Sequence, residues 1–325
     1  MKKCMMLRLI LICCCVCSFH QAYCWGFYGH KRINFLAVFL LPPEMLVFYK
    51  QHIRYLEEHA VDADKRRYAV PQEGPRHYID LDKYGDYPFS ELPRNWREAV
   101  DKFGEDSLNA HGIAPWWIST MLSRLTSAFS EKNSARILKL SADLGHYIAD
   151  VHVPLHTSSN HDGQHTGQKG IHGFWESRIP ELLAEQQWDL LTSRAQYLDK
   201  PAAFIWDRVL ESALASDSVL KIEKKLSQKF PADQRFSFEN RNGAIIRQYS
   251  SAYTIAYDRE MNGMVERRMR SAILAVASCW YTAWVNAGQP SLRQLSQPGW
   301  DEAERAELEQ IQTAWQKGEI LGREH

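Results

Sequence analysis

Histidine and carboxylate residues gather in one short part of this chain. Six of its thirteen histidines fall between positions 146 and 172, at 146, 152, 156, 161, 165 and 172. In "LGHYIADVHVPLH", His146 and Asp150 are four residues apart, and His172 and Glu176 repeat this spacing in "IHGFWES". Residues four apart share one face of a helix. Imidazole and carboxylate both bind zinc, so two such helices could hold metal ions between them.

The alternative reading of one His/carboxylate pair is an ion pair or a helix cap. The repetition of the pair argues against it here, as does His156, which Pro154 should redirect by ending the first helix. His161 and His165 lie in a polar, glycine-rich stretch, where histidines are usually solvated. The sequence therefore predicts a metal site built from His146, Asp150 and the residues that follow them.

Helices must carry most of these residues. Apolar residues recur at helical spacing in 33–60, 95–103, 112–130, 134–153, 172–192, 203–229 and 241–286. A last helix, rich in Glu, Gln and Ala, is predicted at 300–317, and strand alternation is scarce. Long loops are predicted at 62–94, 157–171 and 288–299. We predict an all-α fold, a multi-helix bundle with long functional loops.

The first 24 residues differ from the rest of the chain. Three basic residues and an apolar stretch precede Ala22 and Cys24, which stand at −3 and −1 of a potential cleavage site. This layout predicts a cleaved secretory signal peptide over 1–24, and export to the periplasm or the medium. The apolar run is too short for a membrane span; a lipoprotein acylated at Cys24 is the alternative. The mature chain would begin at Trp25.

Composition limits the function classes. The chain has 325 residues, 45% of them hydrophobic, and a formal net charge of zero, so no overall field favours nucleic acid or an acidic membrane. Cleavage would remove three basic residues, no acidic one, and every cysteine except Cys279, which excludes an internal disulfide. We predict a single domain over 25–325, with 288–325 as a C-terminal extension.

Four segments in this order resemble a known superfamily: "WGFYGH", "HYIDLD", "GHYIADVHVPLH" and "HGFWE". They are similar to motifs of the superfamily that joins bacterial zinc-dependent phospholipases C to the fungal and plant single-strand-specific zinc nucleases. The resemblance extends from Trp25 to about Glu176. It implies an all-helical fold, three zinc ions, and a mature N-terminal Trp that binds metal through its amine and carbonyl groups.

The resemblance also implies which residues bind each zinc ion. The first site would use Trp25, His30 and Asp150. The second would use an upstream aspartate, His77, His146 and, as a bridge, Asp150. The third would use His156, His172 and Glu176.

The upstream aspartate is either Asp62 or Asp64. "ADKRR" matches an Ala-Asp-x-x-Arg motif of the nucleases, which favours Asp64 and places Arg67 near a phosphate. Whichever aspartate it is could also orient the attacking water. Of the other residues near these motifs, Asp80 is placed to orient a ligand histidine, and His152 matches a histidine that is not a ligand in the nucleases.

Three clustered cations suit the hydrolysis of phosphate esters. Glu176 stands where the nucleases have Asp, and Gly170 and Ile171 in "KGIH" replace an Asn of their nucleobase pocket. We therefore expect an exported zinc-dependent phosphodiesterase resembling phospholipase C. The alternatives are a single-strand-specific nuclease and 3′-nucleotidase of the same superfamily, or a non-catalytic zinc-binding protein. Neither a stable protein partner nor a transmembrane span in the mature chain is expected.

Overall fold

The structure is a computed structural model that describes residues 26–241, 243–293, 295, 302–318, 320, 321 and 323. The predicted signal peptide and Trp25 lie outside the described residues. No helix among the described residues is both long enough and apolar enough to cross a membrane.

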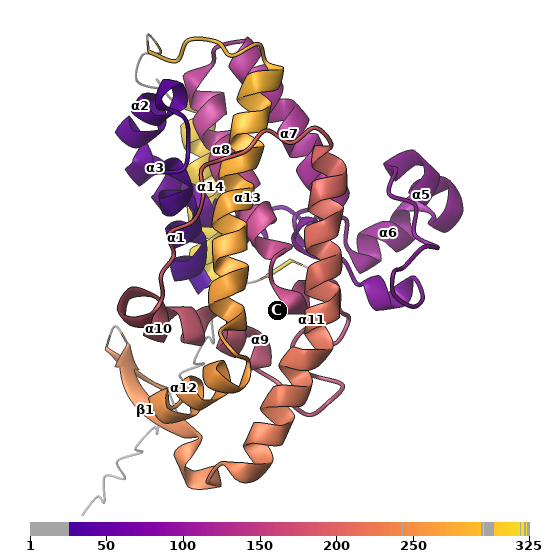
Figure 1. Cartoon of the computed structure of the whole chain (residues 1–325), viewed down its shortest axis with the longest axis vertical. Coiled ribbons are helices and arrows are strands. Elements are labelled where there is room, and N and C mark those ends of the chain that lie inside the picture. Colours follow the sequence, from indigo (N-terminus) through magenta and orange to yellow (C-terminus); the bar gives the residue numbers. More distant parts are fainter. Residues whose placement is uncertain are drawn as a thin grey trace, which may run out of the picture.

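Helices form most of the described chain, as the hydrophobic periodicity predicts (Figure 1). The first half contains α1 (Gly26–Val38), α2 (Pro43–Gln51), α3 (Ile53–Glu58), α4 (Asp62–Arg66), α5 (Trp96–Phe103), α6 (Glu105–His111), α7 (Ala114–Ser130) and α8 (Ser134–Asp150). The second half contains α9 (Ile171–Gly173), α10 (Ile179–Gln187), α11 (Pro201–Lys229), α12 (Ser251–Glu260), α13 (Met264–Asn286) and α14 (Glu302–Lys317). The all-α prediction is confirmed.

A β-hairpin corrects one predicted helix. The helical prediction over 241–286 is wrong at its start, because β1 (Phe236–Arg241) pairs in antiparallel fashion with β2 (Ala244–Tyr249). Gly243 has φ +86° in the connecting turn, and the β-branched Ile245 and Ile246 follow it. A residue that permits positive φ between two pairing segments is typical of a hairpin. A second glycine with positive φ, Gly263, separates α12 from α13.

The hydrophobic core lies between α13 and the helices of the first half. Helix α13 packs against α1, α7 and α8, and the buried Trp280 indole N–H donates to the Ser141 carbonyl of α8 at 3.0 Å. The Tyr49 and Ser141 hydroxyls hydrogen-bond at 2.8 Å. These contacts hold α8, which carries two of the predicted metal ligands, at the centre of the molecule.

Helices α1 and α8 approach each other closely at Gly145. A Cβ atom at Gly145 would lie 2.0 Å from Oδ1 of Asn34 in α1, so only glycine leaves enough room. The Asn34 amide donates to the carbonyls of Leu56 and Ala142 at 3.3 and 3.1 Å. This contact places His30 of α1 beside His146, the residue after Gly145.

Candidate metal centre

Three groups of buried histidine and carboxylate side chains meet inside the helical bundle. Their potential ligand atoms lie within 4.8 Å of one another in each group. The groups are His30, Asp64 and His146; His77, His146 and Asp150; and His156, His172 and Glu176. The structure thus brings together the side chains of every predicted ligand except Asp62 and Trp25, and Trp25 is outside the described residues.

Asp150 lies at the centre of the cluster. One of its carboxylate oxygens, Oδ2, is 2.9 Å from His77 Nδ1 and 3.2 Å from His146 Nε2. The other, Oδ1, is 3.4 Å from His30 Nε2 and 3.8 Å from His156 Nδ1. Burial alone would raise the Asp150 pKa, but His146 and His156 outweigh it and hold that pKa well below its usual value. An ionised carboxylate with two oxygens facing different histidines has the geometry of a bridging ligand.

The third group depends on a local widening of the helix. His172 lies in α9, and Glu176 lies in the following π-helical turn, Phe174–Arg178. Pro180 has no N–H, and its ring would clash with the carbonyl four residues earlier, which explains why the helix widens there. The Glu176 Oε2 atom lies 3.0 Å from His172 Nε2 and 3.5 Å from His156 Nε2.

Backbone carbonyls fix how two of the imidazoles point. The Nδ1–H of His146 donates to the Ala60 carbonyl at 2.8 Å, and that of His156 donates to the His77 carbonyl at 2.6 Å. Each Nε2 atom is then left with a lone pair directed into the cluster, an arrangement typical of histidine ligands. Burial, followed by the neighbouring His146, lowers the pKa of His30, which favours its neutral, metal-binding form.

These donor atoms fit zinc. The Nε2 atom of His146 is 3.1 Å from Nδ1 of His77, and the Nε2 atoms of His156 and His172 are also 3.1 Å apart. Tetrahedral zinc with bonds of about 2.0–2.2 Å places its ligand atoms roughly 3.3–3.6 Å apart. Among the described residues, neither carboxylate oxygen of Asp64 accepts a hydrogen bond, although both are buried. A buried carboxylate without a hydrogen bond, next to imidazole nitrogens that point toward it, is the arrangement expected of a cation site.

The two candidate aspartates of α4 point in different directions. Asp64 Oδ1 lies 3.6 Å from His146 Nε2 and 3.9 Å from His77 Nδ1, at the cluster. Asp62 instead pairs with His59 at 2.5 Å and with Lys65 at 3.2 Å. The geometry therefore favours Asp64 as the upstream ligand and leaves Asp62 in a separate ion pair.

The other three predicted residues, Arg67, Asp80 and His152, have partners outside the three groups. The buried Arg67 donates to the Arg323 carbonyl at 2.5 Å. Asp80 pairs with the Arg323 guanidinium and does not contact a ligand histidine in the contacts described. His152 is buried away from the three groups, where its Nδ1–H donates to the Ile148 carbonyl at 2.7 Å.

Glu73 lies beside the cluster, although its position there was not predicted from the sequence. Its Oε1 atom lies 3.6 Å from His77 Nε2, on the side of the ring away from Asp150. The side chain is fully buried and is also bound by Arg76 at 2.6 Å. The four-residue spacing between Glu73 and His77 was the available signal, and it lay inside a segment predicted to be a loop.

A model of the S1/P1 nuclease family matches residues 25–272. The chain belongs to the S1/P1 nuclease family. This family is zinc-dependent, in agreement with the donor set described above. The matched range includes every residue of the three groups, whereas α14 lies beyond it.

Endonuclease 2 of Arabidopsis thaliana is a relative to which this chain is similar. It is 24% identical over 170 residues, which are 48% of this chain and 56% of the relative. The chain thus spans little more than half the length of the curated relative that it matches. Both comparisons favour the nuclease alternative over the expected resemblance to phospholipase C.

Proposed function

We propose that this protein is a zinc-dependent nuclease that hydrolyses phosphodiester bonds of single-stranded nucleic acid. The observation that carries the proposal is the convergence of His30, Asp64, His77, His146, Asp150, His156, His172 and Glu176 in one buried cluster. This cluster lies wholly within the range matched by the S1/P1 nuclease family.

The three groups would hold three zinc ions. His30 and Asp150, with Trp25, would hold the first; Asp64, His77, His146 and Asp150 the second; and His156, His172 and Glu176 the third. Zinc ions bound there would polarise phosphoryl oxygens and increase the acidity of a bound water. Asp64 would orient the attacking water toward phosphorus, because its carboxylate lies at the cluster, 3.6 Å from His146 Nε2. Asp150 would keep the first two sites close together.

Signal cleavage before Trp25 would complete the first site. Gly26, the first residue of α1, lies against Ser177, and a Cβ atom at Gly26 would be 2.7 Å from the Ser177 hydroxyl oxygen. The mature N-terminus would therefore begin next to the segment that carries Glu176. An alanine inserted before Trp25 in the mature protein should lower the zinc content by one ion per chain. An unchanged zinc content would refute this role of the N-terminal amine.

A phospholipase C-like ester is the second candidate substrate. It is supported by Glu176, which stands where the nucleases of the superfamily have Asp, and which lies 3.0 Å from His172 in the third group. Single-stranded DNA, RNA, a 3′-nucleotide and phosphatidylcholine should be offered to the same preparation. Cleavage of nucleic acid alone supports the nuclease, and cleavage of the lipid alone supports the phospholipase.

Metal content and hydrolysis should be measured together on the mature protein and on two histidine variants. His146→Ala removes a residue shared by two groups and should abolish hydrolysis while lowering the zinc content. His165→Ala removes an exposed histidine of the same region and should change neither. If the wild type binds zinc but hydrolyses none of the four substrates, the protein is a non-catalytic zinc-binding protein and the proposal is wrong.

A further inference from the structure

The C-terminal segment, which we define as the described residues between 302 and 323, folds back toward the metal centre. Helix α14 packs against α4, the helix that carries Asp64. The Trp315 ring lies 5.6 Å from the ring of Phe27 in α1 and 5.7 Å from Nζ of Lys65 in α4. Glu307 pairs with Lys139 of α8 at 2.6 Å. The segment thus spans three of the elements that hold the metal ligands or lie beside them.

Arg323 is bound on several sides. Its guanidinium donates to both carboxylate oxygens of Asp80, at 2.8 and 2.7 Å, and lies 4.0 Å from the centre of the Tyr78 ring. It also donates to the Ser158 carbonyl at 3.3 Å. Both bonds to Asp80 come from one guanidinium nitrogen, Nη1. Charge-assisted pairing of this kind, combined with stacking on an aromatic face, holds the planar guanidinium in place.

The backbone on either side of Arg323 is bound as well. The Leu321 N–H donates to the Arg67 carbonyl at 2.9 Å, and the Arg67 guanidinium donates to the Arg323 carbonyl at 2.5 Å. A buried guanidinium N–H of Arg67 therefore donates its hydrogen bond to a carbonyl oxygen of the segment. That donor suits a phosphoryl oxygen equally well.

The residues that bind Arg323 are close neighbours in the sequence of predicted metal ligands, and we call them the rim of the metal centre. Tyr78 follows the ligand His77 directly, Ser158 lies two residues after His156, and Arg67 lies three residues after Asp64. A segment seated on these residues lies next to three ligands that come from three separate elements.

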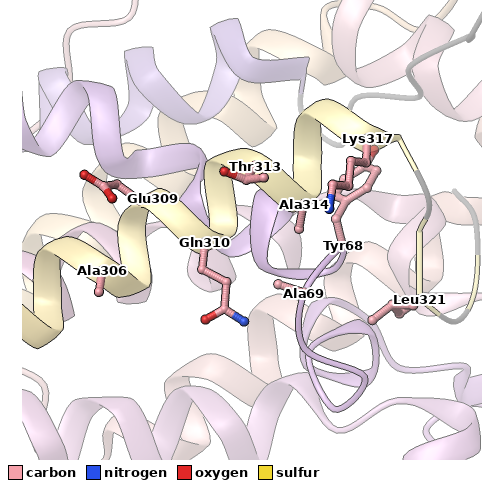
Figure 2. Close-up of a pocket in the computed structure, with 9 residues that line it drawn as sticks. All are labelled: Tyr68, Ala69, Ala306, Glu309, Gln310, Thr313, Ala314, Lys317 and Leu321. Carbon is pink, nitrogen blue, oxygen red and sulfur yellow. The ribbon is translucent and has the colours of Figure 1, made fainter.

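The segment buries few apolar side chains against the rest of the molecule, and open grooves run along it. An open groove of about 550 Å³ lies between α14 and the loop at Tyr68 and Ala69. Figure 2 shows the side chains that line it, with Leu321 at its edge. A second groove, of about 480 Å³, lies between α14 and the side chains of His59 and Asp62. Within the described part of α14, Ile311 is the one buried hydrophobic side chain. Because so few of its apolar side chains are buried, the segment gains little hydrophobic stabilisation and can be displaced at low cost.

We propose that the C-terminal segment is a displaceable plug, which seats Arg323 on Tyr78 and Asp80 and competes with the substrate for the rim of the metal centre. This proposal rests on the proposed function, because the competitor is the phosphate-ester substrate. The segment lies beyond the part of the chain that the family model matches, so the plug would be an addition to the nuclease scaffold. Its release would raise the population of the binding-competent state, which lowers the apparent dissociation constant in proportion.

The test uses the full-length mature protein loaded with zinc, and the variant Arg323→Ala. Arg305→Ala serves as the matched control, because Arg305 is an exposed arginine of the same segment. Three quantities are measured: the KM for a single-stranded oligothymidylate, the Kd of the same labelled oligonucleotide by fluorescence anisotropy, and the hydrogen exchange rate of the Leu321 amide. Arg323→Ala should lower KM and Kd by roughly ten-fold, with kcat within about two-fold. It should also speed the exchange at Leu321, and Arg305→Ala should change none of these quantities.

Each other outcome has a distinct meaning. A higher KM or Kd in Arg323→Ala overturns the plug, since the segment would then help to form the substrate site. If the exchange rate of the Leu321 amide is unchanged, Arg323 does not hold the segment in place, and the proposal is wrong. If the exchange is faster but Kd is unchanged, the segment does not compete with the oligonucleotide, and the proposal is also wrong. If no variant hydrolyses the oligonucleotide, the proposed function fails, whereas Kd and the exchange rate still decide whether the segment competes for the rim.

Discussion

The imidazole ring of His30 lies almost parallel to that of His146, with the ring centres 3.8 Å apart and the planes inclined by 15°. The two rings come from α1 and α8, and their spacing depends on how closely these helices approach at Gly145 and Asn34. Helix packing therefore sets the distances between the candidate ligand atoms of the first two groups.

Gly145→Ala should disturb both stability and metal binding. The new Cβ atom would meet the Asn34 side chain and push α1 away from α8, at a cost of about 1–3 kcal/mol in the free energy of unfolding. Denaturant unfolding and zinc titration would measure the two effects. Gly173→Ala is the control, because a Cβ atom there meets nothing within 4 Å and the backbone is helical. Equal stability of Gly145→Ala and the wild type would contradict this reading of the contact.

The two aspartates of α4 should respond differently to the same substitution. Asp64→Asn should lower phosphodiester hydrolysis by at least roughly 100-fold and reduce zinc content, because its carboxylate faces His146 and His77. Asp62→Asn should lose only the ion pairs with His59 and Lys65, leaving zinc content unchanged. Mass spectrometry of the metal, with rates from the same samples, measures both. If only Asp62→Asn lost zinc, Asp62 and not Asp64 would be the upstream ligand.

Removal of zinc should destabilise the whole protein. The donor groups come from α1, α4, α8, the π-helical turn and the turns that carry His77 and His156, so bound ions would link segments far apart in the chain. Ligands that bind only the folded state raise its stability in proportion to the logarithm of their concentration. We expect a chelator to lower the Tm, and added zinc to restore it. Added magnesium should not restore the Tm, because imidazole nitrogens bind zinc far better than magnesium. An unchanged Tm after complete zinc removal would contradict the linking role.

Asp258→Asn should stabilise the protein at high pH and leave it nearly unchanged at low pH. Burial first, and then the charge of Glu266, raise the Asp258 pKa from 3.8 to about 6, against the opposing charge of Arg267. An acid whose folded pKa is raised destabilises the fold once it ionises, so the penalty is present above about pH 6 and absent below the unfolded pKa. The Tm difference between variant and wild type, measured at pH 8 and pH 4, tests this sign. A difference that is larger at pH 4 would contradict it.

The helical content of this fold could be predicted because most helices carry an apolar stripe that the core requires. The segment 134–153 reads as a helix and is one, ending at Asp150. The hairpin could not be found in this way, because its apolar residues carry no burial signal: Phe238 and Ile245 are 74% and 75% exposed. Only the turn at Gly243 marked it, and a single glycine is weak evidence.

The candidate metal ligands could be singled out in the sequence because histidine and carboxylate residues at helical spacing are unusual so close together. His146, Asp150, His172 and Glu176 share a spacing that a helix converts into a common face, and the resemblance supplied His30 and His77. The sequence could not distinguish Asp62 from Asp64, because both lie in one short helix. The structure separates them by the direction in which their side chains point. Arg323 could not be foreseen, since its contact with Asp80 depends on how a distant segment folds back.

The cluster also has a consequence for the order in which the chain folds. Its side chains come from positions as far apart as His30 and Glu176, and the α13 helix that covers α1 and α8 follows only at Met264–Asn286. Individual helices form within about a microsecond, but contacts between remote segments must first overcome the entropy of closing long loops. The slow step should therefore be the docking of preformed helices, and the metal ions would enter a site that is assembled late.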